Sequence, residues 1–360
     1  MGVSSLKAKI QGEFEQQWRG MLSDYVTAVT WSPQGDILAA CSAHGEVMMW
    51  LVGEGVEGIS LLPGNGESLD CLAFSWDGQF LAATGQNGEV KIWRLQSQQP
   101  ELVSVRKNDG AWIDRMVWSP NSNLLAFSLG RIVQIWNAEI GELEAILNFN
   151  TSSVLDINWH PNGESLAVAG YQEVKIWMAE NWNDEPSLLP VESASLMITW
   201  SPDGKYIASA NMDRSITVLE WENPNPWMMR GFPGKIRDLT WSDTATKSGA
   251  PLLAAASAEG VVVWEKKSDD WEAQVLTVHQ DTVRSLQFQP HTHLLASAAE
   301  DGWVCLSNKG KRISQVLDGA ANGFSCLSWH PQGHLLAAGG NNGELIIWKK
   351  GKRGQGFGKK

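Results

Sequence analysis

Four histidines in the last third of the chain have a spacing that could bind a metal ion. His291 and His293 form an H-x-H pair, and His330 and His334 form an H-x₃-H pair. Neutral imidazole nitrogens bind Zn²⁺ and Ni²⁺, so two such pairs in neighbouring turns would suit a metal-handling protein. The alternative is that all four lie in solvated turns, since His160 precedes a proline, as His330 does, without a second histidine nearby.

The sequence contains no motif that identifies an enzyme. No G-x-S-x-G, P-loop, H-E-x-x-H or paired-carboxylate motif occurs, so we predict neither catalysis nor a cofactor. Charged residues nevertheless recur near the beginning of several apolar segments: Asp70, Asp114, Arg115, Asp156, Arg237, Asp238 and Arg284. Their simplest interpretation is ion pairing between neighbouring strands. A small-ligand or catalytic site in a central channel is the alternative.

These candidate residues belong to a sequence unit that is repeated eight times. Each unit contains an apolar segment ending in Trp or Phe, a polar turn, a small-residue aliphatic segment, a Gly-rich turn and a second apolar segment. The first segments end at Trp31, Phe74, Trp118, Trp159, Trp200, Trp241, Phe288 and Trp329. The units close at Trp50, Trp93, Trp136, Trp177, Leu219, Trp264, Ser307 and Trp348, at intervals of 41 to 45 residues. A constant period of this length, with four short strands per unit, is typical of an all-β fold, the β-propeller.

The two ends of the repeat predict how the propeller closes. An outer strand is expected after each of the first seven closing positions but not after Trp348, and a spare strand, 13–22, precedes the first unit. We therefore expect a closed propeller of eight four-stranded blades, whose last blade is completed by the N-terminal strand. Seven blades are the alternative, because Leu219 and Ser307 replace the closing tryptophan in two units. The expected divisions are an N-terminal extension (1–12), the propeller (13–348) and a basic disordered tail (349–360).

Charge and composition disfavour several other classes of protein. The chain has a net charge of −12, although residues 349–360 contain six basic residues and no acidic one. An acidic body disfavours broad nucleic-acid binding, whereas the tail is expected either to remain disordered or to contact an acidic partner, RNA or anionic lipid. No signal peptide and no apolar run long enough to span a membrane is present, and the four cysteines fall inside expected strands. These features predict a cytoplasmic protein with reduced thiols.

The repeated motifs resemble those of the WD-repeat β-propeller family over residues 13 to 348. W-S-P-x-G is followed at a fixed distance by x-G-x-V-x-I-W, most closely in the segments ending at Trp93 and Trp177. The resemblance implies a non-enzymatic scaffold for protein–protein interaction or complex assembly. It also implies a hydrogen-bonded His, Ser or Thr, Asp and closing Trp, which only His279 and Asp301 clearly match, in a unit that closes at Ser307. These departures favour a divergent, bacterial member of the family.

Tryptophans that the repeat does not require indicate where a partner would bind. They are Trp18, Trp76, Trp112, Trp182, Trp221, Trp227, Trp271 and Trp303. By their place in the repeat, Trp112 and Trp303 share one face with Tyr25, His44, Arg131, Tyr171, Met212 and Arg214. Exposed Trp, Tyr and Arg side chains form binding hot spots, so we expect this face to bind another protein. The alternative for each tryptophan is local packing beneath a loop.

Overall fold

The protein is built from β-strands throughout the residues that the structure describes. The computed structural model describes residues 12–53, 58–95, 100–108, 110–221, 223 and 225–351. These ranges contain 31 strands and no α-helix. Consequently none of the described segments forms a helix long and apolar enough to cross a membrane.

The described strands form six four-stranded antiparallel sheets and one sheet of seven strands. The first three sheets contain β2 (Val26–Trp31), β3 (Ile37–Ser42), β4 (Val47–Leu51) and β5 (Gly58–Leu62); β6 (Leu69–Phe74), β7 (Phe80–Gly85), β8 (Glu89–Arg94) and β9 (Glu101–Lys107); and β10 (Met116–Trp118), β11 (Leu124–Leu129), β12 (Ile132–Asn137) and β13 (Glu142–Asn148). The sixth and seventh repeat units form β21 (Ile236–Ala245), β22 (Pro251–Ser257), β23 (Gly260–Lys266) and β24 (Trp271–Thr277), then β25 (Val283–Phe288), β26 (Leu294–Ala299), β27 (Trp303–Asn308) and β28 (Arg312–Asp318).

The fourth and fifth units share one strand, which the repeat did not predict. Their sheet contains β14 (Asp156–Trp159), β15 (Ser165–Ala169), β16 (Tyr171–Met178), β17 (Ser187–Trp200), β18 (Tyr206–Asn211), β19 (Ile216–Glu220) and β20 (Trp227–Met229). The first part of β17 pairs with β16 and its last part pairs with β18. The pairing changes from β16 to β18 between Ala194 and Ser195, and residues 191–200 contain no glycine or proline that would end the strand.

The last sheet brings together the two ends of the described chain. It contains β29 (Phe324–Trp329), β30 (Leu335–Gly340), β31 (Glu344–Lys350) and, from the other end, β1 (Phe14–Met21), which pairs antiparallel with β31. Buried Phe14 packs edge-on against Trp329, with ring centroids 5.4 Å apart. The expected disordered tail (349–360) begins too early, because Lys349 and Lys350 belong to β31 and pair with Glu15 and Phe14. The rest of that tail beyond Gly351, and the expected extension 1–12 up to residue 11, lie outside the described residues.

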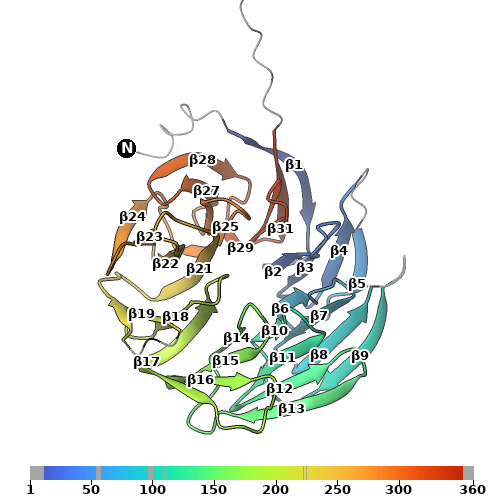
Figure 1. The fold of residues 1–360 in the computed structure, drawn as a ribbon. Coiled ribbons are helices and arrows are strands. Elements are labelled where there is room, and N and C mark those ends of the chain that lie inside the picture. Colours follow the sequence, from blue (N-terminus) through green and yellow to red (C-terminus); the bar gives the residue numbers. More distant parts are fainter. Residues whose placement is uncertain are drawn as a thin grey trace, which may run out of the picture.

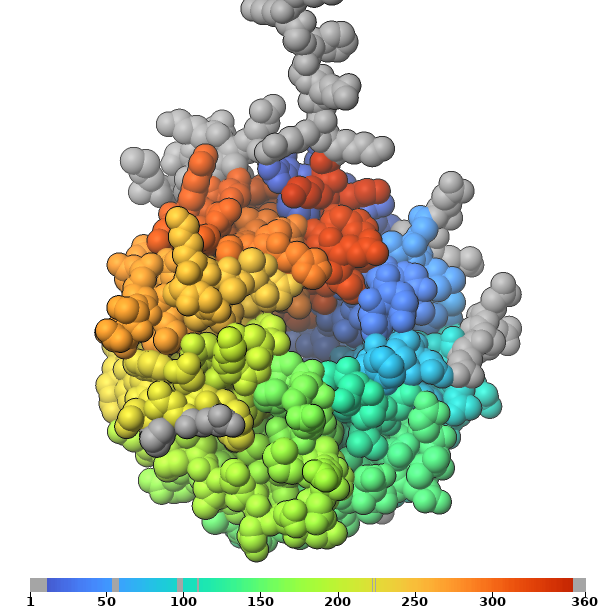
Figure 2. Space-filling model, in the orientation of Figure 1, coloured from blue at the N-terminus to red at the C-terminus, as the bar shows by residue number. Residues whose placement is uncertain are grey.

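The inner strands contact one another in succession around the molecule. β2 contacts β6, the series continues through β10, β14, β17, β21 and β25 to β29, and β29 contacts β2. Figure 1 shows the sheets arranged around a centre, with β5, β9 and β13 on the outside. In the space-filling view the colours run around the molecule until the first and last units lie side by side (Figure 2). The antiparallel sheets and this arrangement are consistent with the predicted β-propeller.

Four of the leading tryptophans tie their unit to the one before it. The buried indole N–H groups of Trp118, Trp241 and Trp329 each donate to a backbone carbonyl on the inner strand of the preceding unit, at 2.9 to 3.2 Å. Trp31 makes the same bond to Ser328 on β29, at 3.0 Å. Each indole therefore buries a large apolar ring between two sheets and also satisfies its polar nitrogen.

The four cysteines are free thiols within these strands. Burial raises the pKa of Cys41 to about 12 and that of Cys326 to about 11. Both groups therefore remain protonated and poorly nucleophilic near neutral pH, as expected of structural cysteines.

Candidate interaction face

Two sets of loops lie at the same end of the strands and build one face, here called the loop face. They are the hairpins between the second and third strands of each unit and the connections that lead to the next inner strand. Backbone or side-chain hydrogen bonds join the two sets: His44 O accepts from Asn65 N, and Met212 N donates to Ala194 O. Tyr171 N likewise donates to the Ser152 hydroxyl at 2.9 Å. The predicted face residues therefore lie at one end of the sheets, either in these loops or, for Tyr171 and Trp303, at the strand end beside them.

Three large side chains stand out from the loop face into solvent. Trp112 is 58% exposed, Tyr171 56% and Met212 54%. The Trp112 indole N–H donates to Asp70 Oδ2 at 2.7 Å, so the carboxylate of one unit orients the ring of the next. An exposed ring held in one orientation loses little conformational entropy when it binds.

Arg214 occupies a backbone position that favours glycine. Its φ is +65°, and the equivalent hairpin positions of other units are Gly45, Gly88 and Gly302, all with positive φ. A left-handed conformation costs a residue with a Cβ roughly 1–2 kcal/mol. Among the residues described, the Arg214 side chain donates only to Pro233 O, at 3.3 Å, so most of its guanidinium N–H groups are left for a partner.

The other predicted face residues differ in exposure. Arg131 is exposed and donates to Asn150 O at 3.4 Å, and His44 is also exposed. Tyr25 and Trp303 are only half-buried, and burial raises the pKa of Tyr25. Six of the eight residues are thus exposed.

Several of the additional tryptophans pack locally instead of forming a surface. Trp18 packs edge-on against Trp50, Trp182 against Trp159 and Trp221 against Trp200, with ring centroids 5.1 to 5.8 Å apart. For these three the local-packing alternative is correct. Their role is to extend the apolar contacts of repeat tryptophans.

Three of the four histidine side chains bond to three different partners, and His330 is buried, so the solvated-turn alternative is wrong for it. His291 Nδ1 lies 3.2 Å from Asp243 Oδ2, and His293 Nε2 bonds to Thr244 O at 3.0 Å. His330 Nε2 bonds to Gly35 O at 2.9 Å, while its ring lies 4.0 Å, centroid to centroid, from that of His334. Among the described residues no three His, Cys, Asp or Glu side chains are grouped so that they could share a metal ion.

The charged residues of the inner strands connect neighbouring units. Arg115 Nε lies 3.1 Å from Asp156 Oδ1 on the next inner strand. Asp156 Oδ2 accepts from Ile198 N at 2.8 Å, and Asp238 Oδ2 accepts from Leu286 N at 2.6 Å. Ion pairing between neighbouring units is therefore confirmed for Arg115 and Asp156, whereas Asp238 binds a backbone N–H and Arg284 pairs with Glu300 of its own unit.

The sequence did not predict a second kind of contact between units, in which a side-chain oxygen of one inner strand accepts from a backbone N–H of the next unit. Carboxylate or amide oxygens cap backbone N–H groups on the free inner edge of the following unit. Asn158 Oδ1 accepts from Trp200 N, and Gln287 Oε1 accepts from Trp329 N. A polar side chain recurring at the third or fifth position of an inner strand is the signal that could have found them.

Asp238 makes the stability of the fold depend on pH. Burial raises its pKa from 3.8 to about 7, so the folded protein retains a proton that the unfolded chain loses between these values. Its contribution to stability is present below about pH 4 and is lost as the pH rises to about 7. Asp238→Asn cannot ionise, so its unfolding midpoint should rise relative to the parent protein across this range and then level off.

Thermal unfolding at a series of pH values measures this effect. Asp281→Asn, which changes an exposed carboxylate, is the matched control and should follow the parent protein. A difference between Asp238→Asn and the parent that stays constant from about pH 4 to about pH 8 would contradict the assignment.

Comparisons with known proteins support the interpretation of the repeated units as WD repeats. Three segments, 12–50, 271–307 and 311–349, match the family model described as WD domain, G-beta repeat. Residues 65–219 match the model of eukaryotic translation initiation factor eIF2A. Neither family model covers half of the chain.

Individual relatives match over about a third of the chain. Transducin beta-like protein 2 from Homo sapiens is 28% identical over 31% of this chain and 29% of its own length. Protein LST8 homolog from Drosophila melanogaster is 31% identical over 32% of this chain and 38% of its own. Meiotic fizzy-related protein 2 from Schizosaccharomyces pombe is 33% identical over 28% of this chain and 19% of its own length.

The chain thus spans less than two fifths of the length of these relatives, all of which are eukaryotic; the bacterial origin stays a prediction. The WD-repeat segments, the eIF2A-type match and the relatives together support a WD-repeat family for this chain.

Proposed function

We propose that this chain is a non-enzymatic scaffold that binds another protein through the loop face. Eight blades, closed by the pairing of β1 with β31, would hold that face rigid. The WD-repeat matches support a protein-interaction role, and the succession of inner-strand contacts supports the closed ring. We also propose that it acts in the cytoplasm, since its four cysteines are free thiols, as is usual in a reducing compartment.

Arg214 is the observation that carries this proposal. An arginine in a left-handed hairpin position is unfavourable for folding, and its charge has no carboxylate partner among the described residues. Arginine and tryptophan side chains are common anchors of protein interfaces. Arg214, Trp112 and Tyr171 would therefore be the anchors, with Arg131 and Met212 as further contacts.

Affinity capture from the cells that make the protein tests this proposal. Arg214→Gly should unfold at the same temperature as the parent protein or higher, because glycine adopts the positive φ without strain. It should nevertheless lose a captured partner by about tenfold or more, as should Trp112→Ala. Trp76→Ala, which removes a 49% exposed tryptophan from a turn at the opposite end of the strands, is the matched control.

Quantitative mass spectrometry of the captured proteins gives the readout. Loss of the same partner from both face variants, with retention by Trp76→Ala, supports the proposal. Equal capture by the parent protein and both face variants contradicts it.

A further inference from the structure

A groove of about 900 Å³ opens at the face opposite the loop face, between the seventh and eighth units. One wall is the hairpin that joins β27 to β28, and the other is formed by the start of β1 and the end of β31. We call this the terminal groove. Its cationic lining residues are Lys309, Lys311, Arg312 and Lys350.

The terminal groove results from the way the chain completes its last sheet. In the seventh unit a hairpin links the third strand to the outer strand, at Asn308–Arg312. In the last sheet the third strand is β31 and the outer strand is β1. These strands come from opposite ends of the described chain, and Phe14 lies opposite Lys350. No described hairpin therefore covers this corner of the last sheet.

The floor of the groove is well packed and partly apolar. Phe14 is buried, and the Gln315 amide bridges it by accepting from Phe14 N at 2.9 Å and donating to Phe14 O at 2.6 Å. Buried Gln289 also donates to Gly333 O at 2.6 Å, across the two units. Leu294, Leu306 and Ile313 line the same space. A rigid floor of this kind can receive an apolar side chain without rearrangement.

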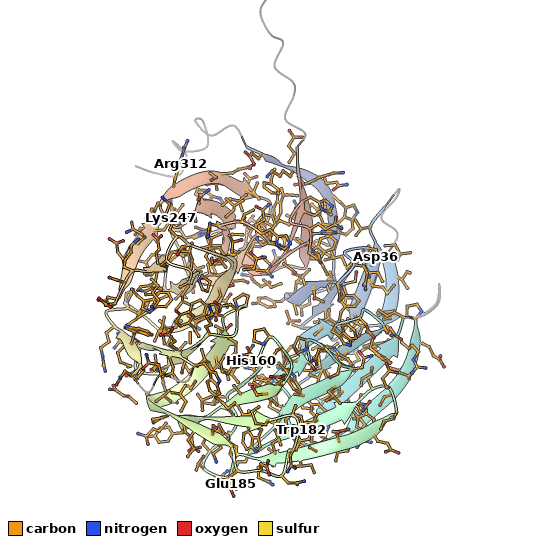
Figure 3. All side chains as sticks on the ribbon, in the orientation of Figure 1. Asp36, His160, Trp182, Glu185, Lys247 and Arg312 are labelled. Atoms are coloured by element: carbon orange, nitrogen blue, oxygen red, sulfur yellow. The ribbon has the colours of Figure 1, made fainter. Side chains whose placement is uncertain are left out.

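The rim of the groove is basic in a protein that is acidic overall. Lys350 lies 3.4 Å from Glu13 and Lys311 lies 3.6 Å from Glu265, so two of the four rim cations have carboxylate partners. Arg312 has no carboxylate within 4 Å among the described residues, and Figure 3 shows it at the outer edge of the ring. The rim therefore keeps a positive charge that its own carboxylates do not balance.

Lys309 adds a feature that packing does not require. It has φ +53° and is followed by Gly310 with φ +63°, the conformation of a tight hairpin turn in which Asn or Gly is preferred at the first position. Lys309 therefore lines the groove from a left-handed backbone conformation that is unfavourable for a residue with a Cβ.

From these observations we propose that the terminal groove binds an acidic peptide segment of a partner protein. The uncompensated cations would pair with glutamate or aspartate, and the apolar floor would receive a hydrophobic side chain of the same segment. Chain segments 1–11 and 352–360 contain lysine or arginine and no acidic residue, so their charge makes them poor occupants. Among the described lining residues the one aromatic side chain, Phe14, is buried, and this lack of a stacking surface for bases favours a peptide over nucleic acid.

Fluorescence anisotropy with a labelled peptide of glutamate and leucine tests the proposal on the full chain. Binding should weaken with salt, and Lys311→Glu/Arg312→Glu should weaken it by about tenfold or more. Lys247→Glu, at an exposed lysine that does not line the groove (Figure 3), should bind as the parent does. If the charge reversal prevents folding, Lys311→Gln/Arg312→Gln serves as the second variant.

The outcomes distinguish a failure of the groove proposal from a failure of the loop-face proposal. Arg214→Gly should bind the glutamate–leucine peptide normally, so a failure of either proposal can be recognised without the other. No binding of this peptide, equal binding by the charge-reversed protein, or equal binding of a labelled oligouridylate would each overturn the inference.

Discussion

Deleting residues 1–22 should leave the protein unfolded or insoluble. The deletion removes β1 and with it the only described strand that pairs with the outer edge of β31. It also removes buried Phe14 and the bond from Leu22 N to Gly343 O. Loss of a buried phenylalanine alone costs about 3–5 kcal/mol, which approaches the whole stability of many domains. Exposure of a long unpaired edge adds a route to aggregation.

Substitutions within β1 show how much of its contribution to stability comes from the packing of Phe14 and how much from the pairing of the strand. Phe14→Ala should lower the free energy of unfolding by about 3–5 kcal/mol in a chemical denaturation experiment. Gln17→Ala, at an exposed position where the pairing with β31 is irregular, should change it by less than about 0.5 kcal/mol. Unchanged thermal unfolding of the 1–22 deletion would contradict the role given to β1.

Asp301→Ala should produce the second large loss of stability. His279 is almost fully buried, with Nδ1 3.0 Å from Asp301 Oδ2 and Nε2 2.8 Å from the Ser297 hydroxyl. Asp301 also accepts from Gln280 N and Trp303 N. The substitution leaves the imidazole and two backbone donors without their acceptor, at a cost of about 3–5 kcal/mol.

The pH dependence of this variant checks the assignment. Burial opposes ionisation of Asp301, but the hydrogen bonds from His279, Gln280 N and Trp303 N outweigh it and lower the pKa. The ionised carboxylate therefore stabilises the fold above its ordinary pKa, and this contribution is lost as the pH falls through the lowered value. Denaturant unfolding should show a large difference from the parent at neutral pH and a smaller one in acid.

Asp281→Ala, on the same connection but exposed, is the control. An Asp301→Ala protein within about 0.5 kcal/mol of the parent at neutral pH would show that the network contributes little.

The repeat was predictable because its signals are local. Turn residues and leading aromatics recur at near-constant spacing, and the packing of Trp118 or Trp329 between sheets follows from that spacing. The His279–Asp301 bond was also predictable, from the family motif. Counting strands further predicted that an N-terminal strand would pair with the last unit, and β1 lies beside β31.

Contacts between side chains of different units could not be predicted in the same way. The bridge from Gln315 to Phe14 joins residues 301 positions apart, and glutamine at that position carries no motif. The orientation of Trp112 depends on Asp70 in the preceding unit, and the sharing of β17 depends on the lack of a turn signal. These features arise from tertiary packing, which one sequence without its neighbours in space does not record.

The central claim is that the loop face binds a protein, and site-specific photo-cross-linking in the cell tests it most directly. A photo-reactive amino acid would replace His44 or Met212 on the loop face, and Asp36 or Glu185 in turns at the other end of the strands (Figure 3). We predict cross-linked products containing a second protein from the His44 and Met212 positions only. Products from the Asp36 and Glu185 positions alone, or from none of the four, would contradict the claim.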